Sequence, residues 1–368
     1  MRKLLILLLL PVVFLSCNRS GMGIFYSISE EQPLADTDLD NTLSVTGFAE
    51  AGTQYVMSAG TLFSRSMTES VWTNTVDMPT GLTVCVSLVT FGTELYAVFA
   101  DSTGNTTGLY TSPTGTVAWT EISVTDNRLT ALTATTTALY LTEMVDSATY
   151  ITRESQDGAD FSTTLTLDGQ YTSVTDSATF AASTWLLSGA NIYKGTAGSP
   201  SSFSKLAGTP ETVAGYGGLM ASSLVPALFL SNAEGTVYAS TDGITWYSAT
   251  IVDSDDNPVP LFDMAEISVA GTPVVLVGAE NGYYDIVFEG GDFTTTFTPA
   301  TPGSEAAGSY SSSDSNYLVV DLRRSVVRFF YVDVAESTIF AGTSGNGLWI
   351  NPISGSDPDT VVRKWDRQ

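Results

Sequence analysis

Short apolar runs alternate with polar turns along most of the chain, from about residue 42 to its end. The runs form a repeating unit. An apolar strand and a tight turn precede a second, stronger strand, Gly or Asn leads into a third strand with an aromatic residue, and a polar turn then ends on Trp or Phe. Short apolar runs bounded by turn residues predict β-strands. The second strands are expected at residues 54–57, 95–98, 139–142, 185–188, 228–231, 274–277 and 339–342.

The closing aromatic residues set the length of the repeat. They are Trp72, Trp119, Phe161, Phe203, Trp246, Phe293 and Trp365. The first six are 47, 42, 42, 43 and 47 residues apart, and the last gap of 72 holds a Thr-, Pro-, Gly- and Ser-rich segment, 295–316, which we interpret as an inserted loop. A repeated four-strand unit of about 40–50 residues is typical of a β-propeller, whose blades stack because no unit can bury both of its faces alone. We therefore predict an all-β fold over residues 42–368, a seven-bladed β-propeller of four-stranded antiparallel blades, with a β-sandwich or β-helix as the alternative.

Two turns between third and fourth strands carry a more specific motif. Residues 240–246 read Ser-Thr-Asp-Gly-Ile-Thr-Trp, and residues 155–161 read Ser-Gln-Asp-Gly-Ala-Asp-Phe. Both resemble the Asp-box, or BNR repeat, in which the Asp carboxylate caps backbone N–H groups, Gly permits the turn and the aromatic ring packs beneath it. The resemblance implies a structural role at the outer edge of a blade. The residues assigned to it are Ser155, Asp157, Gly158, Phe161, Ser240, Asp242, Gly243, Thr245 and Trp246.

The first residues are typical of an export signal. Arg2 and Lys3 precede an apolar stretch at 4–15 that is too short for a relaxed membrane span, and Ser16 and Cys17 follow it. This resembles a bacterial lipoprotein signal, in a relaxed form because Phe14 stands where that family prefers Leu. The resemblance implies a signal peptide at 1–16, acylation of Cys17 with palmitate-type chains, and a lipidated, acidic linker at 17–41. An ordinary secretory signal with an incidental Cys is the alternative, and either predicts an exported protein.

Charge and composition remove several classes of function. The chain has 39 Asp and Glu, 14 Lys and Arg, no His and a net charge of −25. Without His there is no Ser-His-Asp chemistry and no His-ligated zinc site. Nucleic acid is not an expected partner, since phosphate contacts need clustered cations. Cys85 lies in an apolar run and is expected to be a buried core thiol.

Catalytic residues are harder to find. Asp-box propellers include sialidases, which the resemblance associates with an Arg clamp, an Arg-Ile-Pro motif and a Tyr–Glu pair, but that motif is absent here and the Arg residues do not come from successive blades. Asp263, Glu266 and Asp333 stand near first strands, where they could approach the axis, although we interpret them as solvated surface acids. We expect no catalytic residues, no metal site, no cofactor and no enzyme activity.

The favoured function is a binding or scaffold module that is exported and anchored to the bilayer through acylated Cys17. Its partner would be an unidentified protein or glycan that docks on one rim, and the chain is expected to be a monomer. A carbohydrate-active hydrolase or lyase with paired carboxylates, and a cell-envelope assembly factor, are the alternatives. Because Asn18 rather than Asp follows Cys17, we expect the outer membrane or cell surface more than the inner membrane.

Overall fold

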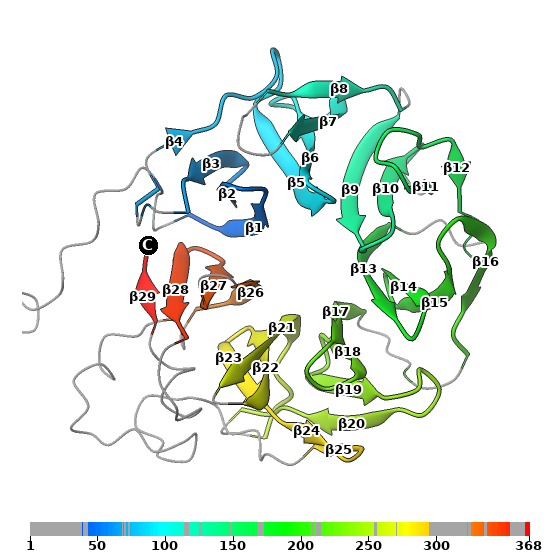
Figure 1. Ribbon diagram of the computed structural model, residues 1–368, viewed down its shortest axis with the longest axis vertical. Coiled ribbons are helices and arrows are strands. Elements are labelled where there is room, and N and C mark those ends of the chain that lie inside the picture. The colour runs from blue at the N-terminus through cyan, green and yellow to red at the C-terminus, as the bar shows by residue number, and fades with distance from the viewer. Residues whose placement is uncertain are drawn as a thin grey trace, which may run out of the picture. The chain divides into compact units, whose positions relative to one another are not determined.

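Seven small antiparallel sheets stand in a ring around a central axis in the computed structural model (Figure 1). The structure describes Leu39, Leu322 and most of residues 43–293 and 325–368. Outside the described residues lie 1–38, 40–42, 294–321, 323–324, 354–364 and shorter gaps at 68, 70, 73, 114–117, 125–126, 148, 166, 168–172, 208–209, 211–214, 254–255, 270 and 335–336. The expected signal peptide 1–16, Cys17 and the loop 295–316 are therefore not described. No helix in the described part of the chain has the length and apolar character that a membrane span needs.

The strands follow one another in chain order, and each blade takes consecutive strands. Blades one to three contain β1 Val45–Glu50, β2 Gln54–Ser58, β3 Thr61–Arg65 and β4 Asn74–Thr75; β5 Val84–Phe91, β6 Glu94–Ala100, β7 Thr107–Pro113 and β8 Thr120–Ile122; β9 Arg128–Ala134, β10 Leu139–Met144, β11 Tyr150–Ser155 and β12 Thr163–Thr164. Blades four and five contain β13 Val174–Phe180, β14 Ser183–Ser188, β15 Asn191–Thr196 and β16 Ser199–Lys205; β17 Tyr216–Ser222, β18 Ala227–Asn232, β19 Thr236–Ser240 and β20 Tyr247–Thr250. Blades six and seven contain β21 Leu261–Val269, β22 Thr272–Ala279, β23 Gly282–Ile286, β24 Phe288–Glu289 and β25 Asp292–Phe293; β26 Val327–Asp333, β27 Thr338–Thr343, β28 Leu348–Pro352 and β29 Asp366–Arg367. The predicted seven-bladed β-propeller is confirmed.

Blade six departs from the regular pattern. Its sheet β21-β22-β23 has three strands, whereas the other six sheets have four, and β24 and β25 form a separate hairpin. This hairpin lies against β20 of blade five instead of extending its own sheet. Phe288 packs on Phe229 and Tyr247 of blade five at ring-centroid distances of 5.7 and 5.8 Å. The outer part of blade six therefore follows the apolar surface of its neighbour.

The hydrophobic core is divided among the blade interfaces. Seven clusters of buried side chains are found among the described residues, and each joins one blade to the next, including blade seven to blade one. Cys85 lies in the cluster between blades one and two and is 2% exposed. Burial raises the pKa of its thiol to about 12, so it is an inert core residue, as the sequence predicted.

The ring closes without exchange of strands. Residues 45–75 form all of blade one, and residues 327–367 form all of blade seven. Side-chain packing therefore joins the two blades: Phe48 stacks on Tyr331 at 4.2 Å and on Phe340 at 4.7 Å between ring centroids. Leu39 and Trp72 complete this cluster.

Candidate functional site

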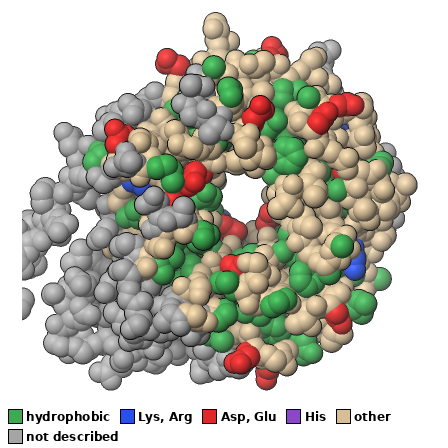
Figure 2. Space-filling view, viewed as in Figure 1, with side chains coloured by type: hydrophobic (Ala, Val, Ile, Leu, Met, Phe, Trp, Pro, Cys, Tyr) green, Lys and Arg blue, Asp and Glu red, His purple; other side chains and the backbone are tan. Residues whose placement is uncertain are grey.

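The innermost strand of every blade has a register irregularity near its start. These inner strands are β1, β5, β9, β13, β17, β21 and β26, and they surround the central opening that Figure 2 shows. Asp and Glu side chains are visible around the opening in the same view. The acids on these strands are Glu50, Asp176, Asp263, Glu266 and Asp333.

Asp176 and Asp263 both lie at the register irregularities of their inner strands, in blades four and six. Asp176 accepts hydrogen bonds from the N–H of Ser177 at 2.8 Å and from the N–H of Leu219 in blade five at 2.9 Å. Asp263 accepts one from the N–H of Phe330 in blade seven at 2.9 Å. In blade two the corresponding residue, Ser87, bonds to the backbone of Leu132 in blade three. These side chains therefore join one inner strand to the next.

Both carboxyl groups are harder to ionise than usual. Burial raises the pKa of Asp176 to about 7, and the negative charge of Asp263 adds to this effect. Burial also raises the pKa of Asp263 to about 6. Each residue is partly exposed, but the surrounding strands remove most of the hydration that favours the charged form.

A second group of polar side chains closes the ring between blades one and seven. The amide Nε2 of Gln54 donates to Asp333 at 3.0 Å, Nε of Arg65 donates to Gln54 Oε1 at 2.7 Å, and the hydroxyl of Tyr331 donates to Glu50 at 3.2 Å. Asp333 is only 2% exposed, so its interpretation as a solvated surface acid is wrong. Burial lowers the pKa of Arg65 to about 10, although the Asp333 charge opposes this shift.

Glu266 holds a turn of the neighbouring blade. Its carboxylate accepts hydrogen bonds from the hydroxyl of Ser222, from the N–H and hydroxyl of Ser223 and from the N–H of Leu224. Burial acts to raise its pKa, but these hydrogen bonds outweigh burial and lower it. Glu266, like Asp333, is not a freely solvated acid, because it fixes the turn between β17 and β18.

All seven neighbouring pairs of blades are thus joined by side-chain hydrogen bonds at their inner strands. The remaining two pairs use Thr90 with the backbone of Glu50 between blades one and two, and Thr133 with Ser177 between blades three and four. Sequence reasoning missed this function of the inner-strand acids. The sequence does place these acids on first strands. It does not show that they reach the next blade, because that distance depends on how the ring closes.

The two turns with the Asp-box pattern are held by their Asp side chains. Asp242 accepts hydrogen bonds from the N–H of Ile244 and Thr245, both at 2.7 Å, and from the hydroxyls of Thr245 and Ser240. These bonds lower its pKa to about 2. Gly243 has φ +71°, and a Cβ there would lie 2.6 Å from the Trp185 ring. The ring of Trp246 also packs on Trp185, at 6.3 Å between centroids.

The turn in blade three has the same arrangement. Asp157 accepts hydrogen bonds from the N–H of Ala159 and Asp160, both at 2.9 Å, and from the Ser155 hydroxyl at 3.0 Å. The Ser155 hydroxyl accepts one from the N–H of Gly158 at 3.0 Å. Phe161 is 3% exposed and packs into the cluster between blades two and three.

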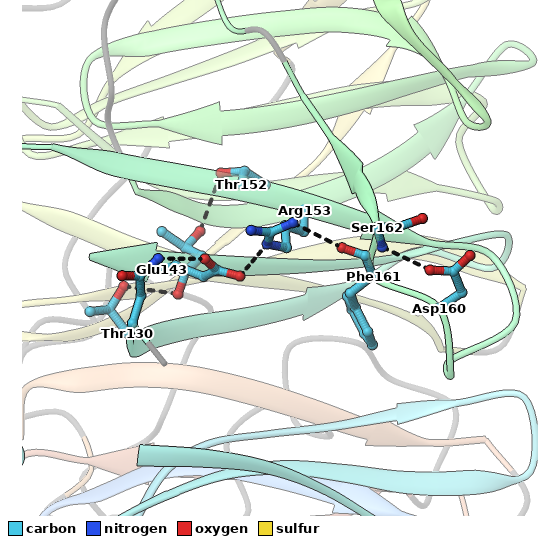
Figure 3. A network of polar contacts seen from close by, with 9 residues as sticks. Thr130, Glu143, Thr152, Arg153, Asp160, Phe161 and Ser162 are labelled. Carbon is cyan, nitrogen blue, oxygen red and sulfur yellow. Dashed lines mark hydrogen bonds and ion pairs between the residues drawn. The ribbon is translucent and has the colours of Figure 1, made fainter. Parts of the chain in front are cut away.

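Beside this turn, Arg153 and the fully buried Glu143 form the one ion pair among the described residues (Figure 3). Glu143 also accepts a hydrogen bond from Asn127 Nδ2 at 3.2 Å. Nη1 of Arg153 donates to the carbonyl of Phe161 at 3.4 Å, which links β11 to the segment before β12. Arg153 also lines a surface hollow at the edge of blades two and three.

The turns between first and second strands differ in charge from the turns between second and third strands. We call the end with the turns between first and second strands the turn face; these turns span 51–53, 92–93, 135–138, 181–182, 223–226, 270–271 and 334–337. None of their described residues is charged, but the turns between third and fourth strands lie at the same end and carry Glu69, Asp157, Asp160 and Asp242. At the opposite end, which we call the loop face, four of the seven turns between second and third strands carry an acid: Asp101, Asp146, Glu234 and Glu280.

Apolar side chains stand out on the turn face. Val334 is 84% exposed and Leu224 is 42% exposed, both in turns between first and second strands. Ile244, in a turn between third and fourth strands and therefore at the same end of the antiparallel blades, is 77% exposed. Leu224 and Ile244 are presented by turns whose backbones Glu266 and Asp242 hold in place.

The described fold makes this chain a β-propeller. No family model and no curated protein matches it. Among solved structures, YCF48 bound to a D1 peptide has a TM-score of 0.57 at 11% identity, over 85% of this chain and 92% of that one. The extracellular domain of BT4673 from B. thetaiotaomicron has TM-scores of 0.55 and 0.54 in two structures, at 14% and 12% identity over 84% and 86% of this chain. This chain spans only 39% and 40% of those two, and identities this low show the shared fold alone.

Proposed function

We propose that this protein is an exported, lipid-anchored, non-catalytic binding module that docks a partner protein on its turn face. The observation that carries the proposal is a pair of exposed apolar side chains, Leu224 and Ile244, on turn-face turns whose backbones are held by hydrogen bonds. Exposed apolar side chains on a fixed backbone lose little conformational freedom when they are covered, which favours binding.

The two side chains suit one partner segment. The turns that carry them are two strand spacings apart in blade five, which corresponds to about 10 Å. We infer a basic partner protein, because the chain has a net charge of −25 and a second copy would be repelled. That YCF48 was solved with a bound peptide is consistent with a propeller of this shape holding a protein segment.

The inner-strand acids support a non-catalytic function. Two oxygens of Asp176 accept backbone hydrogen bonds, and Asp263, Glu266 and Asp333 are engaged with neighbouring blades. A glycosidase needs two carboxyl groups that face a shared substrate space. Carboxyl groups that hold adjacent strands together serve the scaffold instead.

Docking can be tested by photocrosslinking in cells. A benzophenone side chain at position 224 or 244 should give a discrete adduct with one protein, whereas position 145 on the loop face, where Val145 is also 44% exposed, should give none. The purified partner should bind L224D and I244D at least tenfold more weakly than wild type and V145D equally well. Equal binding to all four proteins would exclude the turn face as the docking surface, and adducts of the chain with itself would show self-association instead.

The lipid anchor is tested separately. Labelling with a palmitate analogue should modify the wild-type chain and leave Cys17→Ser unlabelled, while protease treatment of intact cells reports whether the chain is on the outer surface. An unlabelled wild-type chain would refute the anchor and leave the docking proposal intact.

A further inference from the structure

A surface hollow of about 330 Å³ lies at the outer edge of blades two and three. Its lining consists of Ser123, Val124, Arg153, Ala159, Asp160, Phe161 and Ser162. We call it the blade-three pocket. Figure 3 shows the part formed by Arg153, Phe161, Ser162 and Asp160. The volume is at the lower end of the range of small-molecule sites, about 300–1,000 Å³.

Internal comparison with blade five shows that the pocket is a local departure from the repeat. The two turns align on Asp157 and Asp242, so Ala159 and Ser162 of blade three correspond to Ile244 and Tyr247 of blade five. Arg153 corresponds to Tyr238, whose ring packs with Trp185 and Trp246 in an apolar cluster. Blade three therefore has small or polar side chains where blade five has large ones.

Two hydrogen bonds fix the Arg153 side chain and leave some of its donors for a ligand. Its Nε donates to Glu143 and its Nη1 to the Phe161 carbonyl, which uses two of the five N–H donors of a guanidinium. The side chain is 22% exposed although Glu143 is fully buried. Because Arg153 lines the pocket, its remaining donors can bind a planar carboxylate there.

The rest of the lining is suited to hydroxyl groups. Asp160 is exposed, and one of its oxygens accepts the N–H of Ser162 at 2.8 Å, which leaves the other available as an acceptor. The hydroxyls of Ser123 and Ser162 can donate and accept. Val124 adds an apolar wall that can cover one side of a ring.

We propose that the blade-three pocket binds a sugar acid, with its carboxylate on Arg153 and its ring hydroxyls on Asp160 and the two serines. A simple anion is poorly suited, because Glu143 balances the charge of Arg153 and the whole chain repels anions. A ligand with both a carboxylate and hydroxyls uses every polar group of the lining. The pocket is independent of the turn-face docking proposal.

The test compares a sugar acid with its neutral counterpart. Galacturonate and galactose are titrated into the full-length chain by calorimetry, with the binding site followed by chemical-shift changes around residues 153–162. We expect galacturonate to bind at least tenfold more tightly than galactose, and its affinity to persist or rise at higher salt, which screens the net charge. Absence of binding by galacturonate, or equal binding of the two sugars, would overturn the proposal.

A variant that fills the pocket keeps the ion pair intact. Ser162→Tyr introduces the residue that blade five has at this place, and it should weaken galacturonate binding at least tenfold without loss of folding. Tyr247→Ser, the reverse change in blade five, is the matched control and should bind like wild type. Arg153→Lys retains the charge opposite Glu143 but loses the planar fork, and should also weaken binding at least tenfold. Wild-type affinity in Ser162→Tyr would place the ligand elsewhere and refute this site.

Discussion

At the scale of single residues, Gly243 has two constraints that the sequence motif alone does not separate. Its φ of +71° disfavours any side chain, and a Cβ would also meet the Trp185 ring. Gly189 has φ +58° with open space around it, so it isolates the first constraint. The sequence identified Gly243 through the turn motif, whereas the contact with Trp185 depends on how blade five packs on blade four.

The two glycines should therefore differ in how much stability is lost when each is replaced by Ala. Gly189→Ala should cost about 1 kcal/mol of unfolding free energy from backbone strain alone. Gly243→Ala should cost about 3 kcal/mol, because ring displacement is added to strain. Urea denaturation of both variants measures the difference. Equal losses would mean that the ring of Trp185 moves aside freely.

At the scale of elements, the sequence predicted the blades better than it predicted the strands within them. The spacing of aromatic residues is informative because each closing ring must reach the neighbouring blade, as Trp246 reaches Trp185. Blade six could not be predicted in the same way. Phe288 and Phe293 fit the strand pattern, but their rings pack together and Phe288 packs on blade five, which draws the β24–β25 hairpin out of its own sheet.

The turn between β17 and β18 is held by Glu266 of the neighbouring blade, and this stabilisation can be tested. Glu266→Ala removes hydrogen bonds to Ser223 and Leu224 and should cost about 2 kcal/mol of stability. The amides of both residues should exchange with solvent much faster than in wild type. The amides of Ile244 and Thr245, which Asp242 holds, should be unchanged and serve as the internal control. Unchanged exchange at Ser223 would show that the turn is stable without Glu266.

At the scale of the whole molecule, closure of the ring rests on side chains, because no strand is exchanged between blades one and seven. Asp333→Ala would remove an acceptor of the Gln54 amide and the negative charge that favours ionised Arg65, both in buried surroundings. We expect a loss of about 3 kcal/mol in urea denaturation. Asp333→Asn keeps an acceptor for Gln54, so its free energy of unfolding should fall by less. A smaller loss in the Ala variant than in the Asn variant would contradict this account.

The inner-strand acids also set how stability depends on pH. Unfolded Asp has a pKa of about 3.9, whereas Asp176 and Asp263 have pKa values of about 7 and about 6 in the folded protein. The folded state therefore holds more protons than the unfolded chain between about pH 4 and pH 7, and the free energy of unfolding falls as pH rises through that range. The raised pKa of Glu50 and Glu154 acts in the same direction. The lowered pKa of Asp157, Asp242 and Glu266 has the opposite sign, but only in more acidic solution.

Urea denaturation should consequently give an unfolding free energy at pH 5 that exceeds the value at pH 8 by roughly 4 kcal/mol. The double variant with Asn in place of Asp176 and Asp263 should lose most of this difference, because the side chains keep their shape and no longer titrate. Asp160→Asn, at an exposed position, should retain it. A wild-type protein whose free energy of unfolding rises between pH 5 and pH 8 would contradict this account. It would show that burial at the inner strands does not raise the pKa of these two carboxyl groups.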